Sequence, residues 1–434
     1  MTPSPAVARA ASHADEIGPE ELARLRRRMR WVLFSVAALG STGYIAAVTV
    51  GTLVAAEFSG GAALGGLPTT LTTIGTATAA SLLALIMLRA GRRPGLLIGL
   101  ATGVLGGAVV FTSVLTESIP LLLLGSAFTG FANAAGNLGR YIAADMAPPA
   151  HRASAIGLVV WGTTVGAVIG PNLTAPAGTV AVALGLPELS GAYATTVIFI
   201  GLAWLLSVVA LRPEPYALAD PSVLRPPVES TAAPAPELSG LLTRPSVAVA
   251  LVSLVAAQVV MVLIMTMTPL HLIDHGQGLA TVGIVLSAHT FGMFGLSPIT
   301  GRLADRFGPP RVIASGFVVL GIAATIAAIA PPTGGLILAI ALFLLGYGWN
   351  LCFVSASTLV SHGLALSERT RVQGIADTLT WGTAAFASLS SGLIVAAASY
   401  TALGLLGLGL AVIPLGFLAT QRERLRGSMA ARSA

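Results

Sequence analysis

The sequence has 434 residues, of which 55% are hydrophobic and only 9% are charged, and its mean hydropathy is +0.87. Soluble domains contain roughly a quarter charged residues, so this composition excludes an ordinary water-soluble protein. The formal net charge of +6 would suit a nucleic-acid-binding protein. However, the basic residues are all arginine and lie near the two ends and in every second loop. That distribution indicates an integral membrane protein without a nucleic-acid partner.

The hydrophobic residues fall into blocks of roughly 20 or more, the length that an α-helix needs to cross roughly 30 Å of hydrocarbon. No block alternates with period two, as the strands of a membrane barrel do. We therefore predict an all-α membrane protein with twelve transmembrane helices, at 31–56, 68–88, 94–115, 119–144, 155–175, 191–211, 246–270, 279–299, 311–330, 335–359, 373–397 and 401–420.

The stretch 212–244 is rich in Pro, Ala, Ser and Glu, a composition that cannot bury enough apolar surface to fold alone. We interpret it as a cytoplasmic linker between two six-helix bundles, 31–211 and 245–420, with terminal segments 1–30 and 421–434. The two halves resemble each other, since Trp161-Gly162-Thr163 recurs as Trp381-Gly382-Thr383. A duplicated six-helix unit is common in secondary transporters.

The arginines also predict the orientation. With both termini in the cytoplasm, the arginine-containing loops face inward, as expected when cytoplasmic loops retain cations. The opposite loops hold acidic residues instead: Glu57, Glu117, Glu188 and Asp274. The first 30 residues show no cleavable signal peptide, and the single Cys352 excludes a disulfide framework. We expect a multi-pass protein of the bacterial plasma membrane.

The loop after the eighth predicted helix reads Gly301-Arg-Leu-Ala-Asp305-Arg306-Phe-Gly308. This sequence resembles the loop signature G-x-L-x-D-R-x-G of the major facilitator superfamily. The duplicate expected after the second helix departs from it, because Ala84 replaces the first glycine and Leu88 replaces the acid. The resemblance extends from Trp31 to about Thr420 and implies two pseudo-symmetric six-helix bundles.

By that pseudo-symmetry, Asp305 should face the start of the fifth helix near Arg152 and form a gating latch, since a carboxylate is favoured at a helix N-terminus. The alternative is a solvated acid among arginines that merely set the topology. We further predict that Asp145 and Arg140, at the inner end of the fourth helix, pair with Arg89 or Arg93 as gating charges.

The fifth helix contains Gly157, Gly166 and Gly170-Pro171, a spacing that resembles the antiporter signature of the same superfamily. In that resemblance, the glycine pair that should follow is Thr174-Ala175. Glycines four residues apart share one face and allow close helix approach, so we expect this face to pack against a helix of the other half. Ordinary small-residue packing is the alternative.

Ionisable residues within the membrane are costly and so indicate function by default. His289, in the eighth helix, is a candidate proton carrier, or a neutral histidine bonded to a carbonyl. Asp377, in the eleventh, is a second candidate for proton coupling, or a helix cap paired with Arg371. The drug-exporter branch of the family usually has an arginine near Ser126 and an acid in its first helix, and this sequence has neither.

A substrate pocket is predicted from polar and adaptable side chains near the membrane centre. Met is included because flexible thioethers suit promiscuous apolar sites; any one such residue can instead serve core packing. The predicted lining comprises Tyr44, Asn133, Asn137, Gln258, Met261, His289 and Asn350.

The resemblance implies a monomeric secondary transporter that exports small, mostly apolar compounds by proton antiport. Uptake of a small polar nutrient is the first alternative, and a non-transporting membrane sensor is the second. The sequence has no nucleotide-binding loop, metal-ligand cluster or arrangement for a nucleophile, so we expect no cofactor, no metal and no enzymatic activity.

The orientation can be tested with reporter fusions at Gly185 and at Pro226. Because the arginine asymmetry places these positions on opposite sides of the membrane, a periplasm-active reporter should work only at Gly185 and a cytoplasm-active reporter only at Pro226. The same side for both fusions would disprove the predicted topology.

Overall fold

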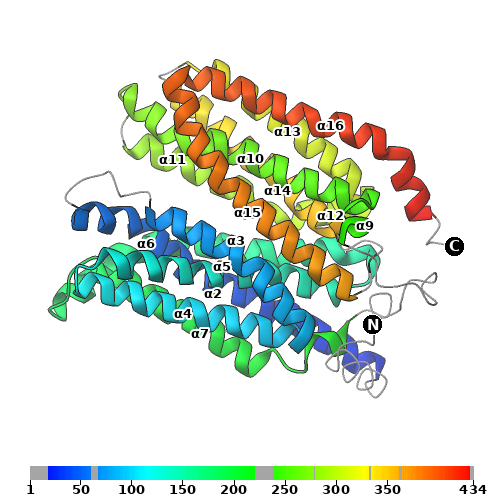
Figure 1. Cartoon of the computed structure of the whole chain (residues 1–434), viewed down its shortest axis with the longest axis horizontal. Helices are drawn as coiled ribbons and strands as arrows, with labels where there is room; N and C mark the ends of the chain where they lie inside the picture. Colours follow the sequence, from blue (N-terminus) through cyan, green and yellow to red (C-terminus); the bar gives the residue numbers. More distant parts are fainter. Residues whose placement is uncertain are drawn as a thin grey trace. The chain divides into compact units, whose positions relative to one another are not determined.

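The computed structural model describes residues 18–59, 67–219, 238–277, 279–331, 334–360, 364 and 366–430. The predicted all-α class is confirmed within these ranges (Figure 1). In this part of the chain, eleven helices are long and apolar enough to cross a membrane, and one shorter apolar helical stretch lies at Ile284–Gly295. Most of the predicted linker, residues 220–237, falls outside the described ranges, as do the outermost parts of both predicted terminal segments.

The chain forms two compact units. Unit 1 consists of the described parts of Met1–Pro149, Leu158–Arg225 and Gln373–Gly382. In it α4 packs along α5 and α7, α3 packs on α5, and α2 packs on α7 (Figure 1). Its elements are α2 (Pro19–Ser59), α3 (Leu67–Ala90), α4 (Arg92–Leu115), α5 (Ile119–Asp145), most of α6 (Arg152–Ala183), α7 (Ser190–Ala210) and the short η3 (Pro215–Leu218).

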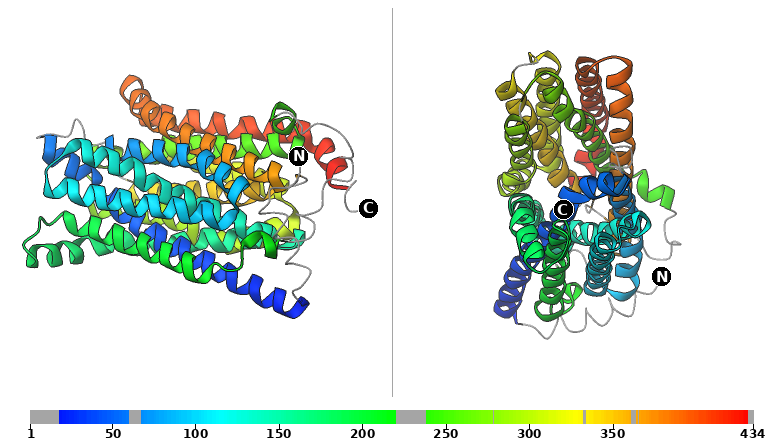
Figure 2. Two further views of the ribbon diagram at one scale, coloured as in Figure 1. Left: turned by 60° about the horizontal axis from the view of Figure 1, so that its bottom comes forward. Right: turned by 90° about the vertical axis from the view of Figure 1, so that its left-hand side faces the viewer.

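Unit 2 consists of the described parts of Ala150–Gly157, Pro226–Val372 and Thr383–Ala434. Here α13 packs on α14 and α16, and α10 packs on the same two helices (Figure 2). Its elements are α9 (Leu238–Leu242), α10 (Pro245–Asp274), α11 (Leu279–Thr290), η4 (Phe291–Gly295), α12 (Ser297–Phe307), α13 (Pro309–Ile329), α14 (Gly335–Val360), most of α15 (Leu366–Ala397) and α16 (Tyr400–Ala430).

Each unit includes one short segment from the other half of the sequence. Gln373–Gly382, which we call the α15 docking segment, belongs to unit 1. Ala150–Gly157, which includes η2 (Pro149–His151) in part and the first turns of α6, belongs to unit 2 and is called the α6 docking segment. These two segments position the polar side chains described below.

The eighth predicted span differs from the prediction because it is not one continuous α-helix. Instead of a single helix over 279–299, the chain forms α11, the π-helical turn η4, and α12. A π turn adds a residue to the turn and shifts the faces of the helix that follows, and such turns are frequent at functional sites. Hydropathy does not reveal it, because the apolar character continues through Phe291 and Phe294.

Other helices extend beyond their predicted ends. α2 begins at Pro19, α15 begins at Leu366, and α6 continues to Ala183 through Pro171 and Pro176. Hydropathy marks the part of a helix that lies in hydrocarbon, whereas the helix itself can continue into water.

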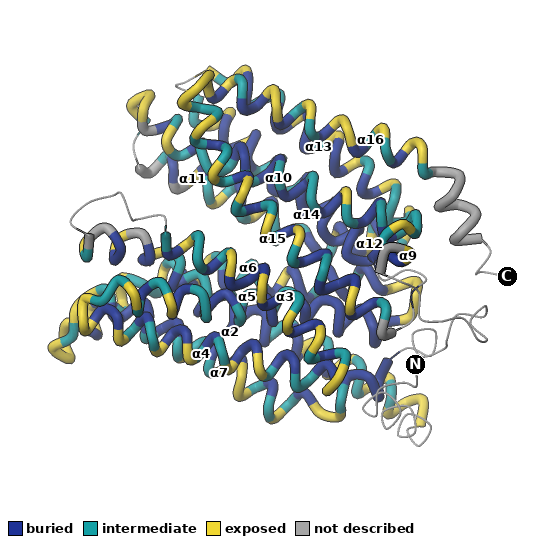
Figure 3. The backbone as a smooth tube through the Cα atoms, in the orientation of Figure 1, coloured by how far each residue is buried: buried dark blue, intermediate teal, exposed yellow. Residues whose placement is uncertain are grey.

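Large apolar side chains cover the outer faces of both units. α16 shows the pattern clearly, with Leu403 and Ala411 buried and Leu405, Val412 and Ile413 exposed (Figure 3). A helix face of exposed aliphatic residues is unfavourable in water and suits contact with lipid tails.

Three glycines of α6 pack on α2 within unit 1. A Cβ atom at Gly162 would lie 2.6 Å from the carbonyl oxygen of Phe34, and one at Gly166 would lie 2.5 Å from backbone atoms of Ser41 and Thr42. Gly170 also faces Thr42, at 3.0 Å. Close packing of this glycine face is therefore confirmed, but its expected partner in the other sequence half is wrong. Only Gly157, in the α6 docking segment, faces a second-half helix, at Ser297.

Gly166→Leu should lower stability, because backbone atoms of α2 cannot move aside as a flexible side chain can. Overpacking of this kind costs about 1–3 kcal/mol. We expect a lower apparent Tm in detergent, measured by tryptophan fluorescence. Gly201→Leu is the matched control, since nothing lies within 4 Å of a Cβ built at Gly201. Equal Tm values for both variants would contradict tight packing at Gly166.

Candidate functional site

Asp305, at the end of α12, binds the first turn of α6 within unit 2. Its Oδ1 accepts a hydrogen bond from the Ala153 amide at 3.0 Å, and its Oδ2 accepts one from the Ser154 amide at 2.9 Å and another from the Ser154 hydroxyl. First-turn amides have no acceptor within their own helix, and the helix dipole favours a negative charge there. The predicted position of Asp305, near the α6 start at Arg152, is confirmed.

The two glycines of the same loop motif explain how Asp305 reaches α6. A Cβ at Gly301 would lie 2.6 Å from the Ala153 carbonyl oxygen, so glycine permits the close approach of α12. Gly308 ends α12 with a φ of +85°, a conformation that favours glycine. Arg306 is exposed and lies 5.3 Å from the ring of its neighbour Phe307.

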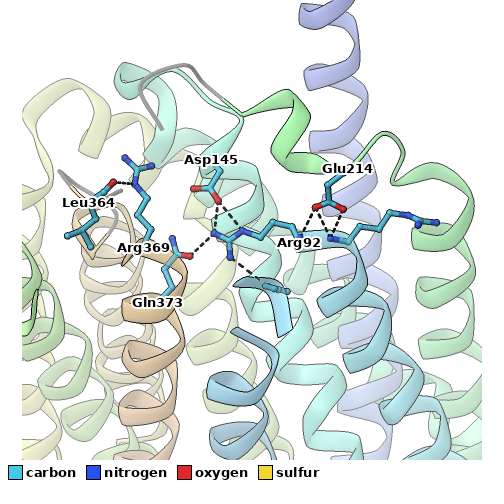
Figure 4. Close-up of polar contacts among 8 residues, drawn as sticks. Arg92, Asp145, Glu214, Leu364, Arg369 and Gln373 are labelled. Atoms are coloured by element: carbon cyan, nitrogen blue, oxygen red, sulfur yellow. Dashed lines mark hydrogen bonds and ion pairs between the residues drawn. The ribbon is translucent and has the colours of Figure 1, made fainter. Parts of the chain in front are cut away.

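The duplicate loop in the first half is organised around Arg92, at the start of α4. Its fully buried guanidinium pairs with Asp145 of α5 at 2.5 Å and donates to Gln373 of the α15 docking segment at 2.8 Å (Figure 4). The expected partners of Asp145, Arg89 or Arg93, are therefore corrected to Arg92. Arg93 instead donates to the Val208 carbonyl at 2.9 Å, and Arg89 is exposed.

Glu214 caps the same helix start. Its carboxylate accepts hydrogen bonds from the amides of Arg92, at 2.6 Å, and Arg93, at 3.2 Å (Figure 4). Burial raises the pKa of Glu214 above its usual value, while the amide donors and the two arginine charges oppose that rise. Gly91, with a φ of +106°, gives the carboxylate room, since a Cβ there would lie 2.9 Å from Glu214.

Arg140 of α5 pairs with Asp377 of the α15 docking segment at 2.5 Å. Both side chains are buried within unit 1, at 1% and 2% exposed. The alternative in which Asp377 pairs with Arg371 is therefore wrong, as is a pairing of Arg140 with the loop arginines, which share its charge. Arg371 is exposed, whereas Asp377 faces the interior of unit 1.

The rest of the α15 docking segment makes neutral contacts with α3. The Thr378 hydroxyl donates to the Ala77 carbonyl at 2.9 Å and lies 2.7 Å from the Ser81 hydroxyl. A Cβ at Gly374 would lie 3.2 Å from the Ala80 carbonyl oxygen, so glycine allows α15 to approach α3 closely.

The predicted pocket residues of the first half lie in unit 1. Asn133 donates to the Thr76 hydroxyl at 3.3 Å, and Asn137 donates to Asn133 at 3.4 Å. Both asparagines and Tyr44 are partly exposed, so they keep surface for a ligand.

In unit 2, Gln258 of α10 accepts a hydrogen bond from the indole of Trp349 of α14 at 2.7 Å. Trp349 stacks on Phe353 with ring centroids 4.4 Å apart, and Phe294 meets its edge at 5.9 Å. Met261 is buried in the same unit. The sequence indicated Gln258 and Met261 but not this aromatic cluster.

Asn350 is occupied by three hydrogen bonds of 2.6 Å. It donates to the Met293 carbonyl and the Ser297 hydroxyl, and it accepts from the Thr300 hydroxyl. All three partners lie in or just after the π turn η4, so Asn350 holds that turn in place. The structure therefore gives Asn350 a structural role at the π turn, and its contact with substrate stays a prediction.

His289 lies in α11, directly before the π turn. Its Nδ1 is 2.9 Å from the Leu342 carbonyl oxygen, which can only accept, so Nδ1 carries the hydrogen. Its Nε2 is buried and has no hydrogen-bond partner among the described residues. A second proton there would create an unpaired buried cation. This geometry favours the carbonyl-bonded alternative over proton transport.

Sequence reasoning missed Arg92, Gln373 and Glu214. The spacing of Gln373 and Asp377, one helical turn apart, was a usable signal that both face the same neighbour. No such signal identified Glu214, which lies far from α4 in sequence. In the described part of the chain, no group of three or more His, Cys, Asp or Glu side chains could hold a metal ion.

Asp305→Asn should loosen the α6 docking segment. The amide keeps one acceptor oxygen but loses the charge and presents an NH2 group to a backbone donor. Hydrogen bonds to charged groups are worth about 1.5–3 kcal/mol, or roughly tenfold to a hundredfold in an equilibrium. We expect hydrogen exchange at Ala153 and Ser154 to accelerate by at least about tenfold. Asp274→Asn, at an exposed carboxylate, is the control; equal exchange in both variants would contradict the latch.

A sequence model described as the Major Facilitator Superfamily matches residues 31–388 and 251–431. The uncharacterized MFS-type transporter YdeG of Bacillus subtilis (strain 168) is 35% identical over 401 residues, which cover 92% of this chain and 93% of that protein. The riboflavin transporter RfnT of Brucella anthropi is 28% identical over 375 residues, covering 84% and 88%.

Among solved structures, the human organic anion transporter MFSD10 (TETRAN) matches with a TM-score of 0.71 and 17% sequence identity, covering 91% of this chain and 99% of that one. At this identity the match shows the fold alone. The family model and the 35% identical relative establish that the chain belongs to the Major Facilitator Superfamily and is a multi-pass secondary transporter, not an enzyme.

Proposed function

We propose that this transporter works by alternating access and exports small, mostly apolar compounds in exchange for protons. It would do so as a monomer in the bacterial plasma membrane, with both termini in the cytoplasm. The observation that carries this proposal is the buried Arg140–Asp377 pair, which supplies an ionisable group within a membrane span.

The docking segments support the alternating-access part of the proposal. Each is a short helical stretch held in its unit by hydrogen bonds at a carboxylate or an arginine, through Asp305 for one and through Arg92 and Arg140 for the other. Polar contacts of this kind can break and re-form without exposing a large apolar surface. They therefore suit a gate that opens in each transport cycle.

The proposed apolar substrate is supported by the predicted pocket residues of unit 2. There Asn350 holds the π turn and the Gln258 carbonyl accepts from Trp349, so these two residues offer fewer polar groups to a ligand. Aromatic and thioether side chains at Trp349, Phe353 and Met261 suit a hydrophobic compound. Export as the direction rests on the resemblance of the α6 glycine pattern to the antiporter signature.

Uptake of a small polar nutrient is the second candidate. It is favoured by one observation, the 28% identity to a protein named as a riboflavin transporter. Asn133 and Asn137, which are partly exposed, could bind the polar groups of such a substrate.

Proteoliposomes distinguish these functions when ethidium and riboflavin are used as probes and a pH gradient is imposed. Proton antiport should drive ethidium toward the more acidic compartment, because the exchanged proton moves away from it. Exchange of one proton for one ethidium cation is electroneutral, so the limiting accumulation is about tenfold per pH unit. Protein-free liposomes correct for passive trapping of the probes.

Riboflavin accumulation in the direction of proton flow would instead establish symport and overturn the export proposal. Movement of either probe at the same rate with and without the gradient would exclude proton coupling for that probe.

A further inference from the structure

Asp377 is a buried carboxylate with only one of its oxygens bonded. Oδ1 accepts from Arg140 at 2.5 Å and lies 3.4 Å from the Tyr141 hydroxyl. Oδ2 is also buried, and it has no hydrogen-bond partner within the described ranges. One lone pair therefore remains available to a proton.

Arg140 is held by its own helix as well as by Asp377. It donates to the Asn137 carbonyl at 2.6 Å and to the Tyr141 hydroxyl at 2.9 Å, and its guanidinium lies 4.2 Å from the Tyr141 ring. These contacts stay with α5 if Asp377 departs. The cation is thus the fixed member of the pair, and the carboxylate is the member that can leave.

The α15 docking segment presents a single polar face to unit 1. Gln373 meets Arg92, Gly374 packs on α3, Asp377 meets Arg140, and Thr378 binds Ala77 and Ser81. Asp377 is the titratable member of this face. The charged or titratable groups around it are Arg140 and Tyr141 of α5 and, one turn away through Gln373, Arg92 with Asp145.

A charge removed from water must be paired or neutralised. While the segment is docked, the positive charge of Arg140 favours the ionised form of Asp377. When the segment leaves, the carboxylate loses that charge, and protonation becomes the less costly state in an apolar environment. Docking therefore disfavours proton binding, and proton binding disfavours docking.

We propose that Asp377 is the proton-carrying group of this transporter, and that its protonation releases the α15 docking segment from α3 and α5. A proton from water binds a carboxylate oxygen and neutralises the charge, and it returns to water when the pair with Arg140 re-forms. This inference rests on the proposed proton antiport, and it assigns that function to one pair of residues.

Distance measurements by double electron–electron resonance can test this without a substrate. Spin labels would be attached at Leu85 of α3 and Leu379 of α15, both of which are exposed, after Cys352→Ala removes the native thiol. The protein would be studied in lipid nanodiscs between pH 5 and pH 8. We expect the ratio of separated to docked segments to rise as pH falls, by up to about tenfold per pH unit for one linked proton.

Asp377→Asn should abolish this pH response and raise the separated fraction at pH 8, because the amide is neutral at every pH. Asp377→Glu should retain a pH response. Glu214→Gln is the matched control, since it removes a half-buried carboxylate that caps α4 and does not contact the α15 docking segment. The control should respond to pH like the parent protein.

A ratio that does not change with pH in the parent protein would overturn the proposal, as would a normal response in Asp377→Asn or a lost response in Glu214→Gln. A merely structural ion pair would change the ratio in Asp377→Asn but give no pH dependence in the parent. Gradient-driven export together with a ratio that does not change with pH would refute only the assignment to Asp377. A ratio that rises as pH falls, without any gradient-driven transport, would refute the antiport itself.

Discussion

The high cost of an unpaired charge in an apolar environment determines how the polar side chains of this transporter are arranged. Arg92 pairs with Asp145, Arg140 pairs with Asp377, and Asp305 binds backbone amides instead of a cation. Two of these three contacts involve a docking segment that comes from the other half of the sequence. The electrostatic requirement to satisfy each of these charges therefore also fixes where these two segments lie within their units.

The two duplicated loops satisfy that requirement in different ways. In the second half, the loop itself supplies the acid, Asp305, and the partners are the amides of the α6 start, which carry no net charge. In the first half, Leu88 stands in place of the acid, and the carboxylate is instead on the incoming helix, as Asp377, with a fixed cation opposite it. The asymmetry leaves the α6 docking segment bound through its backbone amides to one carboxylate. The α15 docking segment is bound by an ion pair between two side chains.

Hydropathy and arginine placement were sufficient to predict the helical class and the positions of the spans, because both depend on the solvent around each segment and not on packing. The neighbour of Asp305 was also predictable, since pseudo-symmetry specifies which helix start it meets. The partners of Asp145, Arg140 and Asp377 were not. Periodicity shows which residues share a helix face, but it does not show which helix lies opposite. The π turn was not predicted for a related reason: a change in helical register leaves the amino-acid composition of the span unchanged.

The same limit applies to the predicted substrate pocket, where a residue's polarity alone did not reveal how it is used. Asn350 was chosen as a polar group near the membrane centre, yet its donors and its acceptor are all bound to groups around the π turn. His289 likewise gives its hydrogen to the Leu342 carbonyl. An unpaired polar group is costly in an apolar environment, so most polar side chains already have hydrogen-bond partners within the ligand-free protein. A polar substrate that competed for them would have to replace those bonds, and a hydrophobic substrate would not incur that cost.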